Sequence, residues 1–128
     1  MIKNILIVDN DAFFIKGLTY SLKQKKFHVV TATDGLQALD ILLTYLPDLI
    51  FLDYIMPAIQ GDKLCRIIRS MAHLKQCYIV MITAAAPEME FDYLSFGANA
   101  CIAKTSFGEM ATYIFNVIEH FETHPEQS

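Results

Sequence analysis

The sequence predicts a single α/β domain in which a five-stranded parallel sheet is covered by helices on both faces. Five short apolar runs alternate along the chain with five segments of helical periodicity, and this order indicates strand, helix, strand units. The clearest runs, at 5–8 and 49–52, are continuously apolar, which is typical of strands buried on both faces. Crossovers between parallel strands are right-handed, so the helices are expected to divide between the two faces of a doubly wound sheet. A chain of 128 residues has room for one such domain.

The first half of the chain contains two pairs of strand and helix. A strand over 5–8 ends in a polar stretch, and the helix after it reaches the basic cluster at 23–26, which is interpreted as a solvated helix end. A second strand over 27–32 is rich in β-branched residues, and Asp34-Gly35 turns the chain into a second helix that Pro47 closes. The helical spacing rests on Phe14, Leu18, Ser21 and Leu22 in the first helix and on Leu36, Leu39, Leu42, Leu43 and Leu46 in the second.

The third strand ends in a carboxylate. Asp53 follows the apolar run 49–52, Pro57 breaks the strand, and Gly61 allows a tight turn before the next helix. In a parallel α/β sheet the carboxyl ends of the strands face the ligand crevice, so Asp53 stands where chemistry is expected. Taken alone, the same residue could equally well cap the following loop.

The second half repeats the pattern. A helix from about 62 leads to a strand over 78–82 that ends at Thr83, and a loop of small residues leads to a helix over 88–96 that Gly97 stops. A fifth strand over 98–103 ends at Lys104 and is followed by the last helix. The apolar residues are Leu64, Ile67, Ile68 and Met71 in the third helix, and Met110, Tyr113, Ile114, Val117, Ile118 and Phe121 in the last.

Composition narrows the class of partner and the location. Lys and Arg number 10 against 14 Asp and Glu, so the basic footprint of a nucleic-acid binder is missing. The apolar runs are four residues long against the roughly 20 of a membrane span, and no signal-peptide pattern opens the chain, so we expect a cytoplasmic protein that does not enter the membrane. Cys65, Cys77 and Cys101 are odd in number and lie among apolar neighbours, which indicates packed thiols.

Polar residues at four strand ends are expected to converge on one edge of the sheet. Hard oxygen ligands of this kind suit Mg²⁺ more than Zn²⁺, because the four histidines fall elsewhere in the chain. The converging residues are Asp9, Asn10 and Asp11 after the first strand, Asp53 after the third, Thr83 after the fourth and Lys104 after the fifth.

These residues carry a resemblance that covers the chain from Ile2 to about Phe121. The sequence Ile-Leu-Ile-Val-Asp-Asn-Asp at 5–11, Asp-Leu-Ile-Phe-Leu-Asp-Tyr-Ile-Met-Pro-x-x-x-Gly at 48–61, Thr83-Ala84, and Gly-Ala-x-x-x-Ile-x-Lys at 97–104 resemble, in this order and spacing, the receiver domain of bacterial two-component response regulators. The resemblance is to receivers that stand alone, with a receiver domain over 1–122 and a tail over 123–128. It implies a flavodoxin-like sheet of strand order 2-1-3-4-5.

The resemblance also implies a chemistry. Asp53 would accept a phosphoryl group from a histidine kinase or a phosphotransfer protein. The protein would not be a turnover enzyme, apart from phosphorylating and dephosphorylating itself. Mg²⁺ would be held by Asp9, Asn10, Asp53 and the backbone carbonyl of Ile55, while Thr83 would bond the phosphoryl group and Lys104 would pair with its charge.

Signalling would follow from a local change at the site. A Thr83 hydroxyl drawn towards the phosphate would leave a space beside Ala84, and Cys101 stands where the family has the side chain that moves with the threonine. The resemblance also implies that Ile55 and Ala85 would frame the path of the attacking water, and neither side chain can orient a water molecule, so slow loss of the phosphate is expected. The output face would be the helix over 88–96, the fifth strand and the last helix. An apolar patch there, serving a protein partner or a second copy, is expected from Met89, Phe91, Tyr93, Phe96 and Phe107.

Three departures from the family pattern keep alternatives open. Asn10 replaces an acidic residue, which should weaken Mg²⁺ binding; Cys101 replaces an aromatic residue; and Thr105 replaces a proline, so a trans Lys104–Thr105 bond is expected. Together they favour, as the second interpretation, a degenerate receiver that docks proteins without being phosphorylated. A more remote alternative is a haloacid-dehalogenase-like phosphatase with Asp9 as nucleophile and Asp11 as acid/base.

Overall fold

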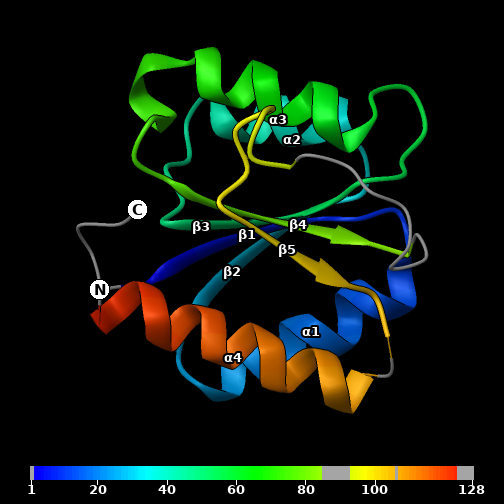
Figure 1. Cartoon of the computed structure of the whole chain (residues 1–128), viewed down its shortest axis with the longest axis vertical. Helices are drawn as coiled ribbons and strands as arrows, with labels where there is room; N and C mark the ends of the chain where they lie inside the picture. The colour runs from blue at the N-terminus through cyan, green and yellow to red at the C-terminus, as the bar shows by residue number, and fades with distance from the viewer. Residues whose placement is uncertain (1, 85–92, 106, 124–128) are drawn as a thin grey trace.

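A computed structural model describes residues 2–84, 93–105 and 107–123. It contains one five-stranded parallel sheet in the order β2-β1-β3-β4-β5, as the resemblance implies. In Figure 1, α1 and α4 cover one face of this sheet, and α2 and α3 cover the other. The strands are β1 Asn4–Val8, β2 His28–Ala32, β3 Leu49–Asp53, β4 Tyr78–Thr83 and β5 Ala100–Ala103; the helices are α1 Ala12–Gln24, α2 Gly35–Leu42, α3 Gly61–Ser70, the short 3₁₀ helix η1 Ala72–Leu74, and α4 Phe107–Thr123.

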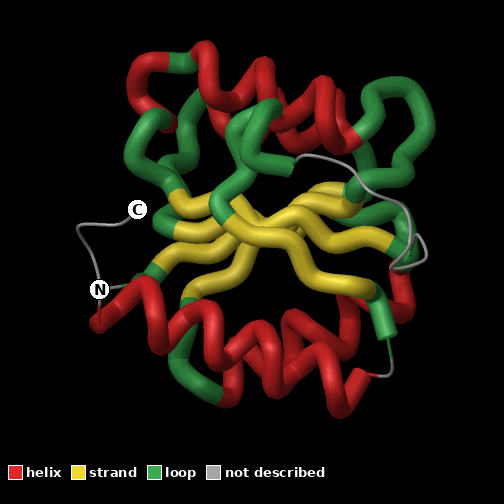
Figure 2. Tube along the Cα trace, viewed as in Figure 1, coloured by secondary structure: helices red, strands yellow, loops and turns green. Residues whose placement is uncertain are grey.

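The sheet separates two apolar cores, as the layers of Figure 2 show. All five residues of β3 are buried, so the prediction of a central strand covered on both faces is confirmed. Its residues alternate between the cores: Ile50 and Leu52 pack with α2 and α3, whereas Phe51 packs with α1 and α4. Cys65 and Cys77 are buried free thiols and Cys101 is half-buried, which confirms that the first two are packed in the core. Among the described helices none is both long and apolar enough to cross a membrane.

Local hydrogen bonds set the ends of α1. The Asp11 carboxylate caps its start by accepting from the amides of Phe13 and Phe14 at 3.1 and 3.2 Å. At its end Lys26 adopts a positive φ of 73°, and the amides of Lys26 and Phe27 donate to the carbonyls of Lys23 and Leu22. This is a Schellman closure with a lysine where glycine is usual. Lys23–Lys26 are exposed, which confirms the interpretation of the basic cluster as a solvated helix end.

The second helix is shorter than its leucines suggest. The spacing extends to Leu46, but α2 ends at Leu42, where the amides of Leu43 and Thr44 donate to carbonyls three residues back and tighten the last turn. Gly35, Ala38 and Leu42 form its buried face. Leu36, Leu43 and Leu46 lie on the surface.

The predicted helix over 88–96 falls largely outside the described residues. Its described end, 93–97, forms hydrogen-bonded turns instead of α-helix, and β5 starts at Ala100 instead of 98. The amides of Gly97 and Ala98 donate to the carbonyls of Leu94 and Tyr93, and Gly97 has a φ of 101°, a left-handed conformation that glycine adopts without strain. Of the expected apolar patch, Phe96 is buried and Tyr93 half-buried, so neither forms an exposed surface. Met89, Phe91 and the side chain of Phe107 lie outside the described part, as does the tail beyond Thr123.

Arg69 links elements at the amino-terminal edge of the sheet. Its guanidinium donates to the carbonyls of Gly97 and Cys77, both at 2.7 Å, and to Asn99 Oδ1 at 2.6 Å. The same Asn99 oxygen accepts from the amide of Ile79 at 2.8 Å. One side chain of α3 thus fixes the starts of β4 and β5.

Candidate functional site

The carboxyl ends of β1, β3, β4 and β5 form the site. Val8 pairs with Leu52, Asp53 with Ile82, and Thr83 with Ala103. This register brings the residues that follow the strands, or end them, to one edge of the sheet. Asp9, Asp53 and Thr83 are the only buried polar or charged residues in the part of the chain that the structure describes. The predicted convergence of strand-end residues is therefore confirmed for these three and, as its contacts show, for Lys104.

Asp9 is held from three directions. It is 1 % exposed, its amide donates to the carbonyl of Ala32 at 3.1 Å, and its Oδ1 accepts from the amide of Asp11 at 2.8 Å. Its Oδ2 accepts from Lys104 Nζ at 2.8 Å in a partly buried ion pair. Removing either partner of such a pair would leave a buried charge uncompensated.

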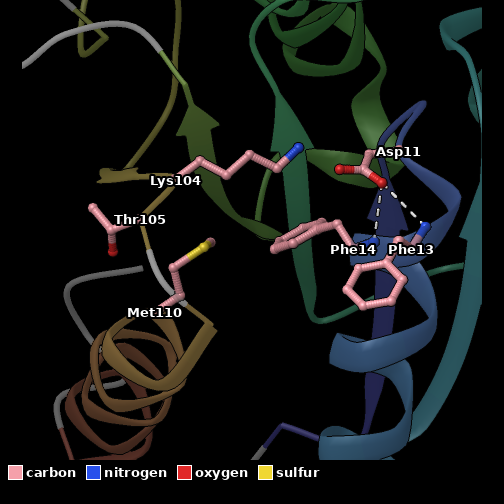
Figure 3. Close-up of a pocket in the computed structure, with 6 residues that line it drawn as sticks. All are labelled: Asp11, Phe13, Phe14, Lys104, Thr105 and Met110. Atoms are coloured by element: carbon pink, nitrogen blue, oxygen red, sulfur yellow. Dashed lines mark hydrogen bonds between the residues drawn. The ribbon is translucent and has the colours of Figure 1, made fainter.

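The Lys104 ammonium therefore contacts Asp9 and does not extend into solvent as an unpaired lysine would. Its ammonium also sits 4.5 Å from the centre of the Phe14 ring, a cation–π contact. Beside it is a hollow of about 230 Å³ lined by Asp11, Phe13, Phe14, Lys104, Thr105 and Met110. Figure 3 shows Lys104 reaching across this hollow from β5 towards α1. The role of Phe14 was missed from the sequence, where only its helical spacing was visible.

Asp53 is a buried carboxylate with a weakened acidity. It is 5 % exposed, and its pKa is raised from 3.8 to about 6. Burial is the largest cause of this shift and the negative charge of Asp9 adds to it, whereas the Lys104 charge and the backbone amides of Ile55 and Tyr54 act in the opposite direction. A bound cation would relieve the repulsion between the buried carboxylates of Asp9 and Asp53.

The other residues that the sequence predicted for the site differ in how exposed they are. Asn10 and Ala84 are exposed, and Ile55 is 53 % exposed. Cys101 is half-buried against the α2–α3 core. Ala85 lies outside the described residues. The Lys104–Thr105 bond is trans, as predicted.

Oxygen donors for Mg²⁺ are present, although no three His, Cys, Asp or Glu side chains gather into a metal site within the described ranges. Asp9 and Asp53 supply two carboxylates whose mutual repulsion a divalent ion would relieve. A third ligand must therefore come from a neutral oxygen, such as the Asn10 amide or the Ile55 carbonyl. The residues present fit a hard cation.

The raised pKa of Asp53 predicts a pH-dependent stability in the absence of divalent ions. The folded state binds the Asp53 proton more tightly than the unfolded state, so ionisation of Asp53 lowers the free energy of unfolding. This loss of stability is complete above pH 6 and becomes smaller as the pH falls towards 3.8. Asp53→Asn should therefore be more stable than wild type at pH 8, by about 1–3 kcal/mol. Urea unfolding with a chelator at pH 8 and pH 4 measures this difference. A difference that stays the same at pH 4 would rule out ionisation as its cause.

Comparison with known proteins identifies the class. The sequence profile of the response regulator receiver domain matches residues 5–114, and the chain belongs to this family. Among relatives, the chain is 35 % identical over 107 residues to the alkaline phosphatase synthesis transcriptional regulatory protein PhoP of Bacillus subtilis, covering 81 % of this chain and 43 % of PhoP. It is 37 % identical over 84 residues to the DNA-binding response regulator MtrA of Mycolicibacterium paratuberculosis, covering 66 % and 36 %. The chain thus spans less than half the length of these relatives.

Solved structures show the same fold. The chemotaxis response regulator CheY4 of Vibrio cholerae superposes with a TM-score of 0.83 at 24 % identity, over 92 % of this chain and 99 % of that one. The response regulator TrrA of Thermotoga maritima, in complex with Mg²⁺-BeF, superposes with a TM-score of 0.75 at 26 % identity, over 89 % and 97 %. The flavodoxin-like receiver fold is therefore confirmed. Membership of the receiver family leaves no place for the phosphatase alternative, and Asp11 serves as the cap of α1.

Proposed function

We propose that this receiver accepts a phosphoryl group on Asp53 from the phosphohistidine of a histidine kinase or phosphotransfer protein. The observation that carries the proposal is the buried Asp53 carboxylate beside the Asp9–Lys104 ion pair. A carboxylate oxygen of Asp53 would form the new bond to phosphorus as the bond from phosphorus to the imidazole nitrogen breaks. The imidazole leaves with the electron pair. Each transfer would modify one protein molecule once, so the protein would not act as a turnover enzyme.

The chain's own residues supply positioning and charge. Burial holds Asp53 in one place, and a raised pKa keeps its oxygen electron-rich once it is ionised. Lys104 is already anchored near the site by Asp9 and Phe14, so its charge can meet the transferred phosphoryl group with little rearrangement. Thr83, buried at the end of β4, would offer its hydroxyl to a phosphoryl oxygen.

Mg²⁺ would be held by Asp9, Asp53, Asn10 and the carbonyl of Ile55. When bound, it would neutralise charge that develops on the phosphoryl oxygens. The complex of TrrA with Mg²⁺-BeF supports this assignment by relationship.

The amide of Asn10 predicts weaker Mg²⁺ binding than a carboxylate at the same position would give. Asn10→Asp should raise the affinity several-fold or more, about 1 kcal/mol, because it adds a full charge beside a divalent ion. Titration of both proteins with Mg²⁺, followed by NMR shifts, measures the two constants. Asp34→Asn, a change of charge at the remote cap of α2, is the control. Equal affinities in wild type and Asn10→Asp would remove Asn10 from the ligand set.

The signal would be read by another protein in the cytoplasm. We propose that β5, α4 and the segment 88–96 form the responsive face, with Thr83, Ala84 and Cys101 linking it to Asp53. Thr83 pairs with Ala103 of β5 in the sheet, and Cys101 lies on the same strand. The net charge of −4 supports a protein target over direct contact with nucleic acid.

The deciding experiment is phosphorylation by a small donor. Wild type and Asp53→Asn are incubated with acetyl phosphate and Mg²⁺ and examined by intact mass. The wild type should gain the mass of one phosphoryl group and Asp53→Asn should gain none. A wild type that stays unmodified, and whose NMR spectrum is unchanged by beryllofluoride, would favour the degenerate receiver that docks proteins without phosphorylation.

Ile55 predicts a long-lived phosphorylated state. Its exposed apolar side chain stands two residues after Asp53 and cannot orient a water molecule for attack on the phosphate. Loss of such positioning can cost on the order of tenfold to hundredfold in rate, so Ile55→Asn should shorten the lifetime by about that factor. Decay of phosphorylated protein, followed by intact mass, measures it, and Ile55→Val should decay as wild type does. If Ile55→Asn decays no faster, Ile55 does not control the water.

A further inference from the structure

Four leucines lie in the α2 region, and three of them are exposed on the surface of the fold. Leu36, Leu43 and Leu46 are 62 %, 68 % and 58 % exposed, and Leu39 is partly buried against the core. We call these four residues the leucine stripe. The buried face of α2 is supplied by other residues, Gly35, Ala38 and Leu42. Single exposed leucines are ordinary on a surface, but a contiguous row of them indicates a contact site.

The spacing places the stripe along one side of α2. Leu36 and Leu43 are seven residues apart and therefore lie above one another, with Leu39 between them. Gly35 lies against Leu64 of α3, because a methyl group built on it would stand 3.5 Å from that side chain. Leu39, one turn after Gly35, therefore lies on the side of α2 next to α3. Figure 1 shows the two helices together on one face of the sheet.

The stripe continues beyond the helix. Leu46 lines a hollow of about 220 Å³ together with Pro47, Asp48, His73, Gln76 and Cys77. On the α3 side, Ile67 and Met71 are half-buried, so part of each apolar side chain is open to solvent. This surface lies away from the α1–α4 face of the sheet and does not include Asp9, Asp53 or Lys104.

We propose that the stripe is the contact between two copies of this chain, related by a two-fold axis. In such a contact each patch faces a copy of itself, so the charges around it must be complementary to themselves. The two helices meet this condition: α2 exposes the acidic Asp40 beside the stripe, and α3 exposes the basic Lys63. Rotation about the axis can set Asp40 of each copy against Lys63 of the other. A partner of uniform charge would instead meet one of them with like sign.

The size of the stripe sets the expected strength. A stable interface buries roughly 800 Å² on each partner, and three leucines supply only its centre. The rest comes from the polar rim, so the dimer should be weak and dependent on protein concentration. The proposal does not rest on phosphorylation, because the contact leaves the Asp53 edge and the α4 face free.

Sedimentation of the full chain over a range of micromolar concentrations tests the proposal. The average mass should rise with concentration from 14.5 kDa towards twice that value. Leu43→Gln should weaken the association at least about tenfold, because it removes a buried side chain from both copies. Leu94→Gln, at a leucine 64 % exposed outside the stripe, is the control and should leave the association unchanged.

Charge reversal separates this contact from general stickiness. Asp40→Lys and Lys63→Asp should each weaken the dimer, and the two together should restore it, since each new charge then meets its opposite. Thermal melts of each variant verify that it is folded. A wild type that stays at one chain mass at every concentration would overturn the proposal and leave the stripe to a different protein. Failure of the double variant to recover would overturn the two-fold pairing, whatever the acetyl phosphate experiment shows at Asp53.

Discussion

Replacing Arg69 by methionine is expected to lower the free energy of unfolding by about 3 kcal/mol or more. Methionine keeps much of the alkyl stem but removes the guanidinium that donates to the carbonyls of Gly97 and Cys77 and to Asn99. These acceptors are partly buried, so water can replace the lost donor only in part. Hydrogen bonds from a charged donor are about twice as strong as neutral ones, and these three short ones are lost together with two longer ones to the carbonyls of Leu74 and Lys75. Urea unfolding measures the change.

Two further variants show that the effect belongs to the guanidinium. Arg66→Met removes a charge from the same helix, but Arg66 is exposed and its guanidinium only approaches the Phe96 ring, at 5.7 Å from the ring centre, so a loss of less than about 1 kcal/mol is expected. Arg69→Lys keeps the charge but cannot reach three acceptors in a plane, and it should resemble Arg69→Met. If Arg69→Lys were as stable as wild type, a single hydrogen bond or the charge alone would account for the stability that Arg69 provides.

Strand positions were predictable from the sequence because their determinants are local. A continuous apolar run predicted β3 at 49–52, and the strand extends one residue further, to Asp53 at the edge of the sheet. The extent of α2 was less predictable, since a leucine pattern does not reveal whether the helix or a tightened turn carries the last leucine. The start of β5 moved to Ala100 because the capping bonds at Gly97 and Ala98 occupy the residues before it.

The site shows the same division between local and distant causes. That Asp9, Asp53 and Thr83 gather at one edge follows from the order of strands and turns. That Lys104 pairs with Asp9, 95 residues away, and rests on Phe14 depends on packing between β1, β5 and α1, which no local pattern encodes. Arg69 was likewise unnoticed, since its partners at Gly97 and Asn99 lie 28 and 30 residues further along the chain.

Gly61 is the position where one added methyl group should harm both stability and chemistry. A Cβ there would stand 2.4 Å from the carbonyl oxygen of Asp53 and 2.7 Å from the Cα of Tyr54. Both are backbone atoms, so they cannot turn aside as a side chain would. The amide of Gly61 also donates to the carbonyl of Tyr54 at 2.8 Å, which ties the start of α3 to the end of β3. The backbone that carries Asp53, the proposed phosphoryl acceptor, must therefore shift.

Gly61→Ala should lower the free energy of unfolding by about 1–3 kcal/mol, the usual cost of overpacking. Transfer to Asp53 should slow by about tenfold to hundredfold, because a displacement of about 1 Å at a reacting group has that effect. Gly108→Ala is the matched control, since nothing lies within 4 Å of the added atom; it should keep the rate and lose no stability, because alanine is the better helix former in α4. Urea unfolding and the rate of modification by acetyl phosphate give the two quantities. A Gly61→Ala protein that is less stable yet phosphorylated at the wild-type rate would mean that α3 moves away and Asp53 keeps its place.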